Sequence, residues 1–276
     1  MAEAARHQQA NEPAAGREPF RGLINALTGT LMFFGEMAVL SLRSASTLLR
    51  EGVYLGDLVK QMAVVGADSL WIVLIITTAT GAVFAFYTAM LATSIGFTQF
   101  VGGTLAYGFL NELGPVLGGV AFAARAGAAM AAEIGTMVVT EQVDALRAMA
   151  VSPIRYLVLP RVLASLIMLP LLTVIADFAG LVGGYLFAER SGVSSALFLD
   201  SVYKFAQSVD MTRGLIKSVV FGFMVGLISC QQGLRTSGGA SGVGRATTSS
   251  VMLGVMMIFI TDFFLAQILT GQIQRR

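Results

Sequence analysis

The feature that most constrains this chain is a run of 43 residues, Ser69 to Asn111, that contains no Asp, Glu, Lys or Arg. One helix needs about 20 apolar residues to cross the hydrocarbon core of a bilayer, so this run is long enough for two crossings. Over the whole chain 55% of residues are hydrophobic and 12% are charged, whereas about 25% are charged in soluble domains. Because the apolar runs are continuous and do not alternate with polar residues, they favour helices over an outer-membrane β-barrel.

Hydropathy therefore predicts an all-α integral membrane protein with five transmembrane helices. The expected spans are about 69–92, 102–124, 157–188, 214–234 and 250–271. Ahead of them, apolar residues recur at helical spacing from Phe20 to Phe34, which predicts an amphipathic interfacial helix at about 20–50. The alternative for that segment is a helix packed on a soluble core. Residues 1–19 are polar and lack the apolar core of a signal peptide, so we expect a disordered cytoplasmic tail.

The distribution of Lys and Arg predicts the orientation, since these residues are enriched on the cytoplasmic side. A cytoplasmic N-terminus places 12 of the 18 on or near that side and puts the C-terminus outside. The other six would face the opposite side: Arg190, Lys204, Arg213, Lys217, Arg275 and Arg276. The absence of an Arg- and Ser-rich, acid-poor transit segment favours a bacterial inner (cytoplasmic) membrane over a plastid.

Composition also excludes several functions. A net charge of +2 without a basic block gives no sign of nucleic-acid binding. The one cysteine, Cys230, and the one histidine, His7, allow neither an internal disulfide nor a His-containing metal site nor a Ser-His-Asp triad. No Walker A loop is present, so we expect no catalytic residues, metal or cofactor on this chain. The glycine-rich stretch GGASGVGRATT (238–248) is expected to be a flexible connection before the fifth span.

Four carboxylates fall in or beside the apolar spans, where an ionised side chain costs at least ~2.5 kcal/mol on insertion scales. Glu112 is the most informative, because Gly114 and Pro115 follow it and free backbone groups that need partners. Glu112 either lines a substrate cavity, with Asn111, or is a carboxylate that packs between helices. The other three carboxylates are expected near span ends or in helix contacts: Asp68, Asp177 and Asp262. The candidate lining residues, each with core packing as its alternative, are Phe84, Phe86, Tyr87, Tyr107 and Leu110.

Small residues are concentrated in two places and indicate close helix packing. The run Ala121–Ala132 is consistent with bundle packing or a dimer seam, and Arg125 within it could pair with Glu133 or reach a lipid phosphate. The third span carries three glycines near its end and two internal prolines, so it is expected to be tilted or broken: Pro160, Pro170, Gly180, Gly183 and Gly184.

The segment VVTEQVDALRAMAVSPIRY between spans two and three is much longer than a turn requires. Val139, Val143, Leu146 and Ala150 form one helical stripe, which predicts an amphipathic helix that Pro153 ends. Asp144 and Arg147 are spaced to pair along it. On spacing alone, such a helix could lie on lipid or fit a groove in a partner protein.

Together these strings resemble the MlaE/YrbE permeases, the membrane subunits of MCE-associated ABC transporters. The resemblance covers about residues 20–271 and is carried by ELGPVLGGV, ARAGAAMAAEIGTM, TEQVDALRAMAVSPIRYLVLPRVLA, LPLLTVIADFAGLVGG and GGASGVGRATT. It implies a permease with a second copy or paralogue, and a separate ABC ATPase that holds ATP and Mg²⁺. Residues 133–151 would then form the cytoplasmic coupling helix, with contacts from Glu133, Glu141, Gln142, Asp144, Leu146, Arg147 and Met149.

The resemblance further implies transport of phospholipid or a related membrane lipid between the inner membrane and a periplasmic MCE-domain protein. Glu112 would line the lipid cavity, but Asn111 stands where some relatives carry a basic residue, so a salt bridge from that position to a lipid phosphate is not expected. Two other functions remain open at this point. One is a proton-coupled secondary carrier that uses Glu112, Asp177 or Asp262, and the other is a membrane anchor for an MCE ring that transports nothing.

Overall fold

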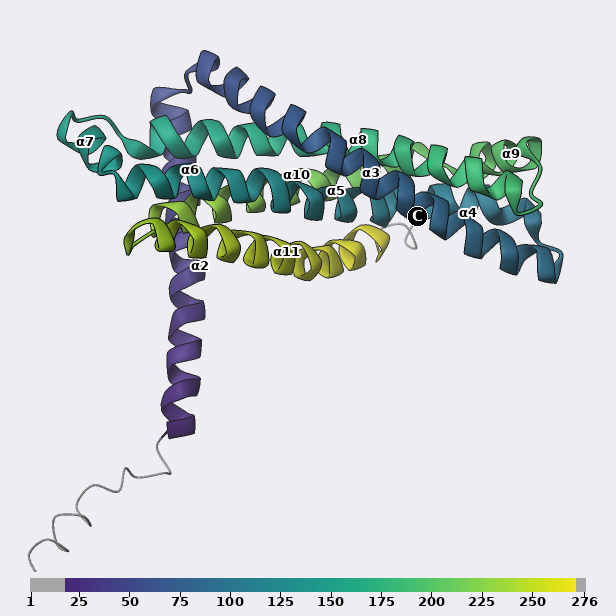
Figure 1. Cartoon of the computed structure of the whole chain (residues 1–276), viewed down its shortest axis with the longest axis horizontal. Helices are drawn as coiled ribbons and strands as arrows, with labels where there is room; N and C mark the ends of the chain where they lie inside the picture. The colour runs from purple at the N-terminus through teal and green to yellow at the C-terminus, as the bar shows by residue number, and fades with distance from the viewer. Residues whose placement is uncertain (1–17, 272–276) are drawn as a thin grey trace, which may run out of the picture. The chain divides into compact units, whose positions relative to one another are not determined.

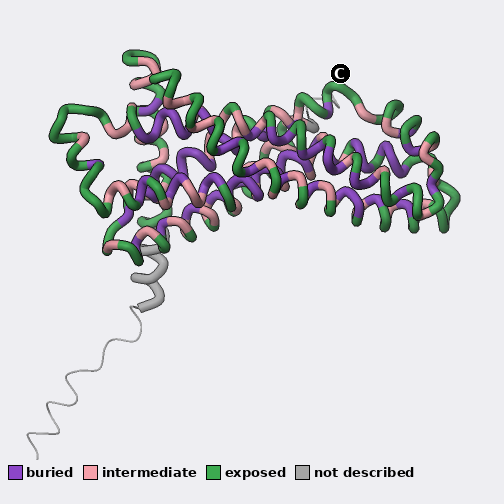
Figure 2. Tube along the Cα trace, turned by 45° about the horizontal axis from the view of Figure 1, so that its top comes forward, coloured by how far each residue is buried: buried purple, intermediate pink, exposed green. Residues whose placement is uncertain are grey.

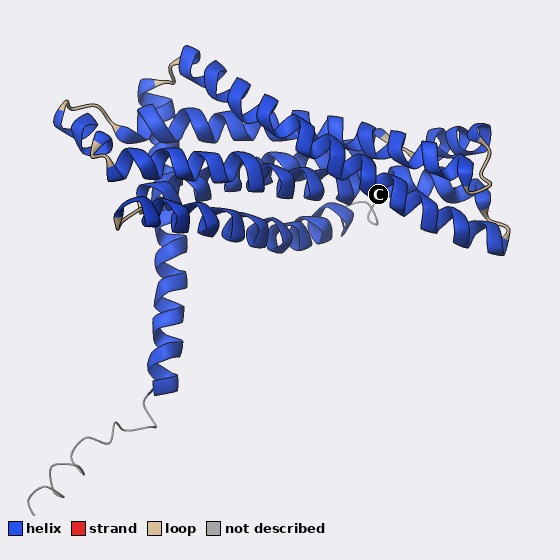
Figure 3. Ribbon diagram, in the orientation of Figure 1, coloured by secondary structure: helices blue, strands red, loops and turns tan. Residues whose placement is uncertain are grey.

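The computed structural model describes residues 18–271, so nearly all of the tail expected at 1–19 lies outside the described residues. Within this range the chain is helical, without strands (Figure 3). Contacts between residues divide the chain into two units, Met1–Leu42 and Arg43–Arg276. Helix α2 (Glu18–Glu51) continues across that boundary. Between residues 28 and 42 it exposes large apolar side chains such as Leu31, Phe34 and Leu42, as a helix bound to a membrane face would.

The second unit contains five helices that are long and apolar enough to cross a membrane. Each expected span lies inside one of these helices, the fifth ending with α11 at Gly271. The fold class is thereby confirmed. The first, third, fourth and fifth are formed by α3 (Leu55–Ile95), α8 (Leu159–Arg190), α10 (Ser208–Leu234) and α11 (Gly239–Gly271). The second, Thr98–Val139, is built in sequence from η2 (Thr98–Phe100), α4 (Val101–Gly108), η3 (Phe109–Leu113), α5 (Gly114–Phe122), η4 (Ala123–Gly127) and α6 (Ala128–Val139).

Two short helices lie between the spans, at opposite ends of this unit (Figure 1). Helix α7 (Gln142–Ala148) connects spans two and three, and α9 (Ser195–Phe205) connects spans three and four. They lie at opposite ends because one spanning helix, α8, separates them in the chain. Figure 2 shows that buried residues line the inner sides of the helices. The second span and α10 are the most enclosed, whereas few residues of α11 are buried.

Prolines in the spans are accommodated by wide helical turns. Pro115 follows the π-turn η3, in which the N–H of Gly114 donates to the carbonyl of Phe109, and Pro160 follows the π-turn η5 (Ile154–Val158). Proline has no N–H to donate, so a local change of hydrogen-bond register is the expected response. Pro170 lies inside α8, which nevertheless continues to Arg190, so of the two expectations for the third span, tilted or broken, the break does not occur.

Glycines allow α3 and α8 to approach closely, as predicted for Gly180, Gly183 and Gly184. A Cβ atom on Gly183 would meet the backbone carbonyl of Thr78, and one on Gly81 would meet that of Gly180. In the run Ala121–Ala132 the buried face is formed by Ala123, Ala126 and neighbouring residues, whereas Ala124 is exposed. This run therefore contributes to bundle packing and leaves a second face uncovered.

Two expectations about the spans are wrong. The stretch 238–248 is not a flexible connection, because α11 begins at Gly239 and is helical through it. Arg213 does not belong to a polar connection before the fourth span, because α10 begins at Ser208; Lys217, which the expected span 214–234 already contained, lies in the third turn of this helix. The side chain of Lys217 is only 2% exposed.

Candidate functional site

A polar cluster inside the bundle is centred on Lys217. Its Nζ donates a hydrogen bond to Glu112 Oε2 at 2.5 Å and lies 2.9 Å from Asp262 Oδ1. Lys217 comes from α10, Glu112 from η3 and Asp262 from α11. One ammonium group therefore joins three of the five spans.

Arg213, one turn before Lys217 on α10, forms the second part of this cluster. Its NH1 group donates to Asn111 Oδ1 at 3.3 Å and to Asp210 Oδ1 at 3.2 Å. Asp210 is itself fixed by the capping box at the start of α10, where its carboxylate accepts from the N–H of Gln207. We call these residues the polar cluster: Asn111, Glu112, Asp210, Arg213, Lys217 and Asp262.

The polar cluster contains three carboxylates and two cations, and its groups differ in accessibility. The Glu112 side chain is 45% exposed, whereas its partner Lys217 is almost fully enclosed. Asp262 Oδ1 lies near Lys217 but has no aligned hydrogen-bond donor. Charged groups in a span are tolerated when they pair with one another and face a cavity or the bundle interior. The cluster thus offers one reachable carboxylate held in place by a buried lysine.

The remaining two carboxylates of the spans lie elsewhere. Asp177 on α8 is 5% exposed, packs against Gly114, and its Oδ1 has no hydrogen-bond partner among the described residues. Asp68 is 2.9 Å from Arg125 NH2. Arg125 therefore does not pair with Glu133, one of the two alternatives considered above; Glu133 instead pairs with Arg161.

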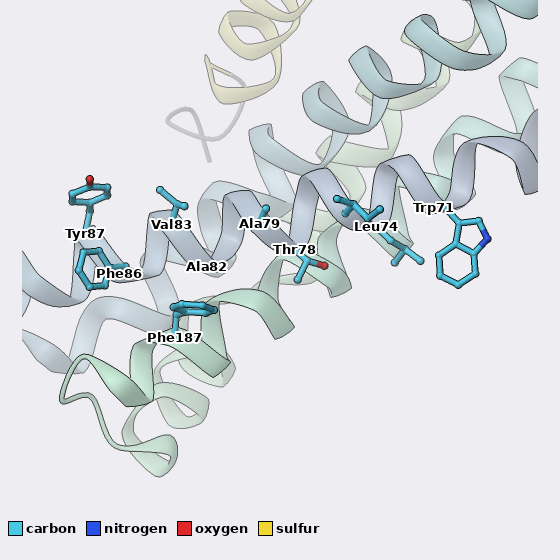
Figure 4. A pocket seen from close by; sticks show the side chains of 10 residues that line it. Trp71, Leu74, Thr78, Ala79, Ala82, Val83, Phe86, Tyr87 and Phe187 are labelled. Carbon is cyan, nitrogen blue, oxygen red and sulfur yellow. The ribbon is translucent and has the colours of Figure 1, made fainter.

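The other predicted lining residues do not converge on Glu112 within one chain. Phe86 and Tyr87 line a groove of about 720 Å³ along α3, together with Trp71 and, from α8, Phe187 (Figure 4). Tyr107 borders a separate hollow of about 200 Å³ that also involves Phe205 at the end of α9. Phe84 packs against a hydrophobic core, which was the alternative to a lining role. Leu110 is half-buried, and its backbone carbonyl lies against Gly214.

The segment expected to be the coupling helix is shorter than predicted. Glu133 lies on α6, which ends at Val139, and α7 begins at Gln142. The apolar stripe from Val139 to Ala150 is therefore not on one continuous helix. Helix α7 ends at Ala148, ahead of Pro153. Asp144 and Arg147 pair at 2.7 Å, as their spacing predicted. The other residues named for this surface lie on or beside α7: Glu141, Gln142, Leu146 and Met149.

Strained backbone conformations flank α7. Glu141 and Ala150 both have φ of 60°, in the left-handed region that non-glycine residues avoid. At the C-terminal end, the N–H of Val151 bonds to the carbonyl of Leu146 and that of Ala150 to Arg147, which is a Schellman motif with alanine in the usual glycine position. The ends of α7 are thus defined by tight turns.

Sequence reasoning missed the cations of the polar cluster. Lys217 and Arg213 were counted as outer-side charges, although Lys217 stands in the apolar stretch GLIKSVVFGF, where a lone ammonium requires a partner. A search for a carboxylate at similar depth in another span would have suggested Glu112 or Asp262. In the part of the chain that the structure describes, no three His, Cys, Asp or Glu side chains gather as metal ligands.

Residues 58–268 match the family model described as Permease MlaE. The chain belongs to the MlaE permease family. A probable ABC transporter permease protein of Rickettsia conorii is 38% identical over 240 residues, covering 85% of this chain and 91% of the relative. One from Synechocystis is 44% identical over 208 residues, covering 75% and 79%.

A third relative comes from a plant. The Arabidopsis thaliana protein trigalactosyldiacylglycerol 1, chloroplastic, is 38% identical over 220 residues, covering 79% of this chain and 63% of the plant protein. With the five spans, these relationships identify this MlaE-family chain as a multi-pass permease subunit of an ABC transporter. Such a permease is a non-enzymatic membrane subunit that works with an ATPase.

Proposed function

We propose that this MlaE-family permease moves a phospholipid or related lipid between the bacterial inner membrane and a periplasmic MCE-domain protein. Family membership supports the transport role, and the name of the plant relative refers to a diacylglycerol glycolipid. Lipid cargo requires a path that tolerates acyl chains and accommodates a polar head. The permease itself performs no covalent chemistry.

The observation that carries this proposal is the polar cluster inside an apolar bundle, in which one carboxylate is accessible and its cation is buried. The Glu112 side chain is 45% exposed, and the buried Lys217, which also pairs with Asp262, holds it in place. A lipid head leaving water loses hydrogen bonds, and a buried polar group without partners costs about 1–3 kcal/mol. The Glu112 carboxylate would replace some of those bonds, and the apolar helix surfaces would contact the tails. The amide of Asn111 is buried and bonds to Tyr107 and Arg213.

The energy would come from a separate ABC ATPase that binds ATP and Mg²⁺. Helix α7 and its flanks form the proposed docking surface, since most of their side chains are exposed and they lie at one end of the bundle (Figure 1). With the N-terminus in the cytoplasm, this end is cytoplasmic. The end with α9 then faces the periplasm and the MCE-domain protein.

A second permease copy or a paralogue would complete the lipid cavity. Within one chain the groove of Phe86 and Tyr87 and the hollow beside Tyr107 are separate from Glu112. Exposed large apolar residues on α11, such as Met256, Phe259 and Phe263, provide surface for such a pairing.

The test is ATP-dependent lipid movement by the assembled transporter in proteoliposomes, with wild type compared with Glu112→Gln. This variant keeps the size of the side chain and removes its charge, so we expect at least about a fivefold loss of transport with normal assembly. The matched control is Glu36→Gln, which makes the same change at an exposed carboxylate on α2 and should transport like wild type.

Two results would contradict the proposal. Unchanged transport by Glu112→Gln would remove this carboxylate from the lipid path. Wild-type transport that follows a proton gradient and persists with a disabled ATPase would instead indicate a secondary carrier.

A further inference from the structure

An ion pair joins the two stems of the hairpin that carries α7. Arg161, in the first turn of α8, places NH2 2.7 Å from Glu133 Oε2 on α6. The Arg161 side chain is only 5% exposed, whereas that of Glu133 is 57% exposed. Arg161 NH1 also donates to the carbonyl of Leu157 at 2.8 Å, inside the π-turn η5. The guanidinium thus connects α6, η5 and α8 at one point.

Helix α7 itself makes little contact with the rest of the bundle. Val143 is its buried residue, and its main packing partner is α6. The tight turns at Glu141 and Ala150 connect α7 directly to the two stems. A displacement of α7 therefore reaches the bundle through α6 and through η5–α8.

Both stems lead to the membrane interior. Helix α6 is the last part of the second span, which carries Asn111 and Glu112, and α8 carries Asp177 against Gly114. If the stems could separate freely, movement of α7 would spread them and leave the polar cluster in place. A charge-assisted hydrogen bond from a buried arginine opposes that separation.

We propose that the Arg161–Glu133 ion pair is a positioning pair that makes α6 and α8 move together when the ATPase acts on α7. The inference rests on the proposed function, because it takes α7 as the ATPase docking surface. Neither residue contacts the lipid, and Glu133 on α6, which pairs with Arg161, acts within this chain in place of the ATPase contact expected for it above. Their role is to convert movement of α7 into rearrangement of the spans, so that ATP hydrolysis and lipid movement stay coupled.

The test measures lipid moved per ATP hydrolysed by the complete transporter. Glu133→Gln keeps the shape and a hydrogen-bond acceptor but removes the charge from a half-exposed side chain, so folding should be retained. We expect ATPase co-purification and ATP hydrolysis at wild-type levels, and a fall of about five- to tenfold in lipid moved per ATP. Glu36→Gln on α2 is the matched control, which makes the same change at an exposed carboxylate outside the hairpin and should keep the wild-type ratio.

A double-mutant cycle adds a measurement that general loss of stability would not reproduce. If the two side chains act through each other, Glu133→Gln combined with Arg161→Gln should lower the ratio no further than the worse single variant. Additive losses would overturn the proposal, as would a wild-type ratio in Glu133→Gln or a failure of that variant to bind the ATPase. Absence of ATP-dependent lipid movement in the wild-type transporter would instead contradict the proposed function.

Discussion

At the scale of single residues, Lys217 decides how the spans tolerate their carboxylates. Its ammonium is shared between Glu112 and Asp262, which come from different helices. Arg213 has a similar role one turn away, between Asn111 and Asp210. Both basic side chains thus point inward, and the cluster depends on them more than on any single acid.

Replacing Lys217 should therefore be more damaging than replacing Glu112. Lys217→Met would leave two carboxylates without their cation, and we expect the free energy of unfolding to fall by about 3 kcal/mol. This is the low end of the range for breaking a buried ion pair, because Glu112 is half-exposed. Glu112→Gln leaves Lys217 beside Asp262 and should cost about 1 kcal/mol. Unfolding of the purified variants in detergent measures both. Equal stability of Lys217→Met and wild type would show that the ion pairs contribute little.

At the scale of helices, the contact between α3 and α8 depends on residues without side chains. Carbonyl groups of one helix lie where a Cβ on the other would be, at Gly81 and Gly183. Close backbone approach provides van der Waals contact that lipid, as apolar as the side chains, does not replace. This explains why a small-residue pattern is informative in a membrane span.

Adding one methyl group at this contact should separate the helices. Gly183→Ala would bring its Cβ against the carbonyl of Thr78, and we expect a loss of about 1–3 kcal/mol in unfolding free energy, as for other overpacked sites. Gly244→Ala on α11 has open space around its Cβ and should be neutral or stabilising by up to about 1 kcal/mol. Similar destabilisation of both variants would mean that packing at Gly183 is not the cause.

At the scale of the whole molecule, the proposed orientation places α7 and α9 on opposite sides of the membrane. Met149 beside α7 and Tyr203 on α9 are exposed, while the one native cysteine, Cys230, is buried. A membrane-impermeant maleimide should therefore label Met149→Cys from the cytoplasmic side and Tyr203→Cys from the periplasmic side. Unsubstituted protein should remain unlabelled and serves as the control. The reverse pattern would invert the topology, and labelling of both variants from one side would contradict the five-span arrangement.

The sequence alone determined the number and approximate positions of the five spans, the carboxylates at membrane depth and the family. It could do so because backbone groups in a bilayer must bond within their own helix, so an apolar run of sufficient length specifies a spanning helix without knowledge of its neighbours. Ion pairs within one helix could also be predicted from sequence spacing, as Asp144 and Arg147 show. Helix boundaries were harder to predict, since α11 begins within a glycine-rich stretch whose low helix propensity would leave it unstructured.

Only the tertiary structure decided which charges meet. Lys217 and Glu112 are 105 positions apart, Arg161 and Glu133 28, and Arg125 and Asp68 57, and no periodicity within a helix encodes these pairings. They depend on how the helices rotate and pack, which close glycine contacts and wide turns at Pro115 and Pro160 control. The sequence shows that a charge in a membrane span has an energetic cost. The three-dimensional arrangement of the helices determines which partner offsets that cost.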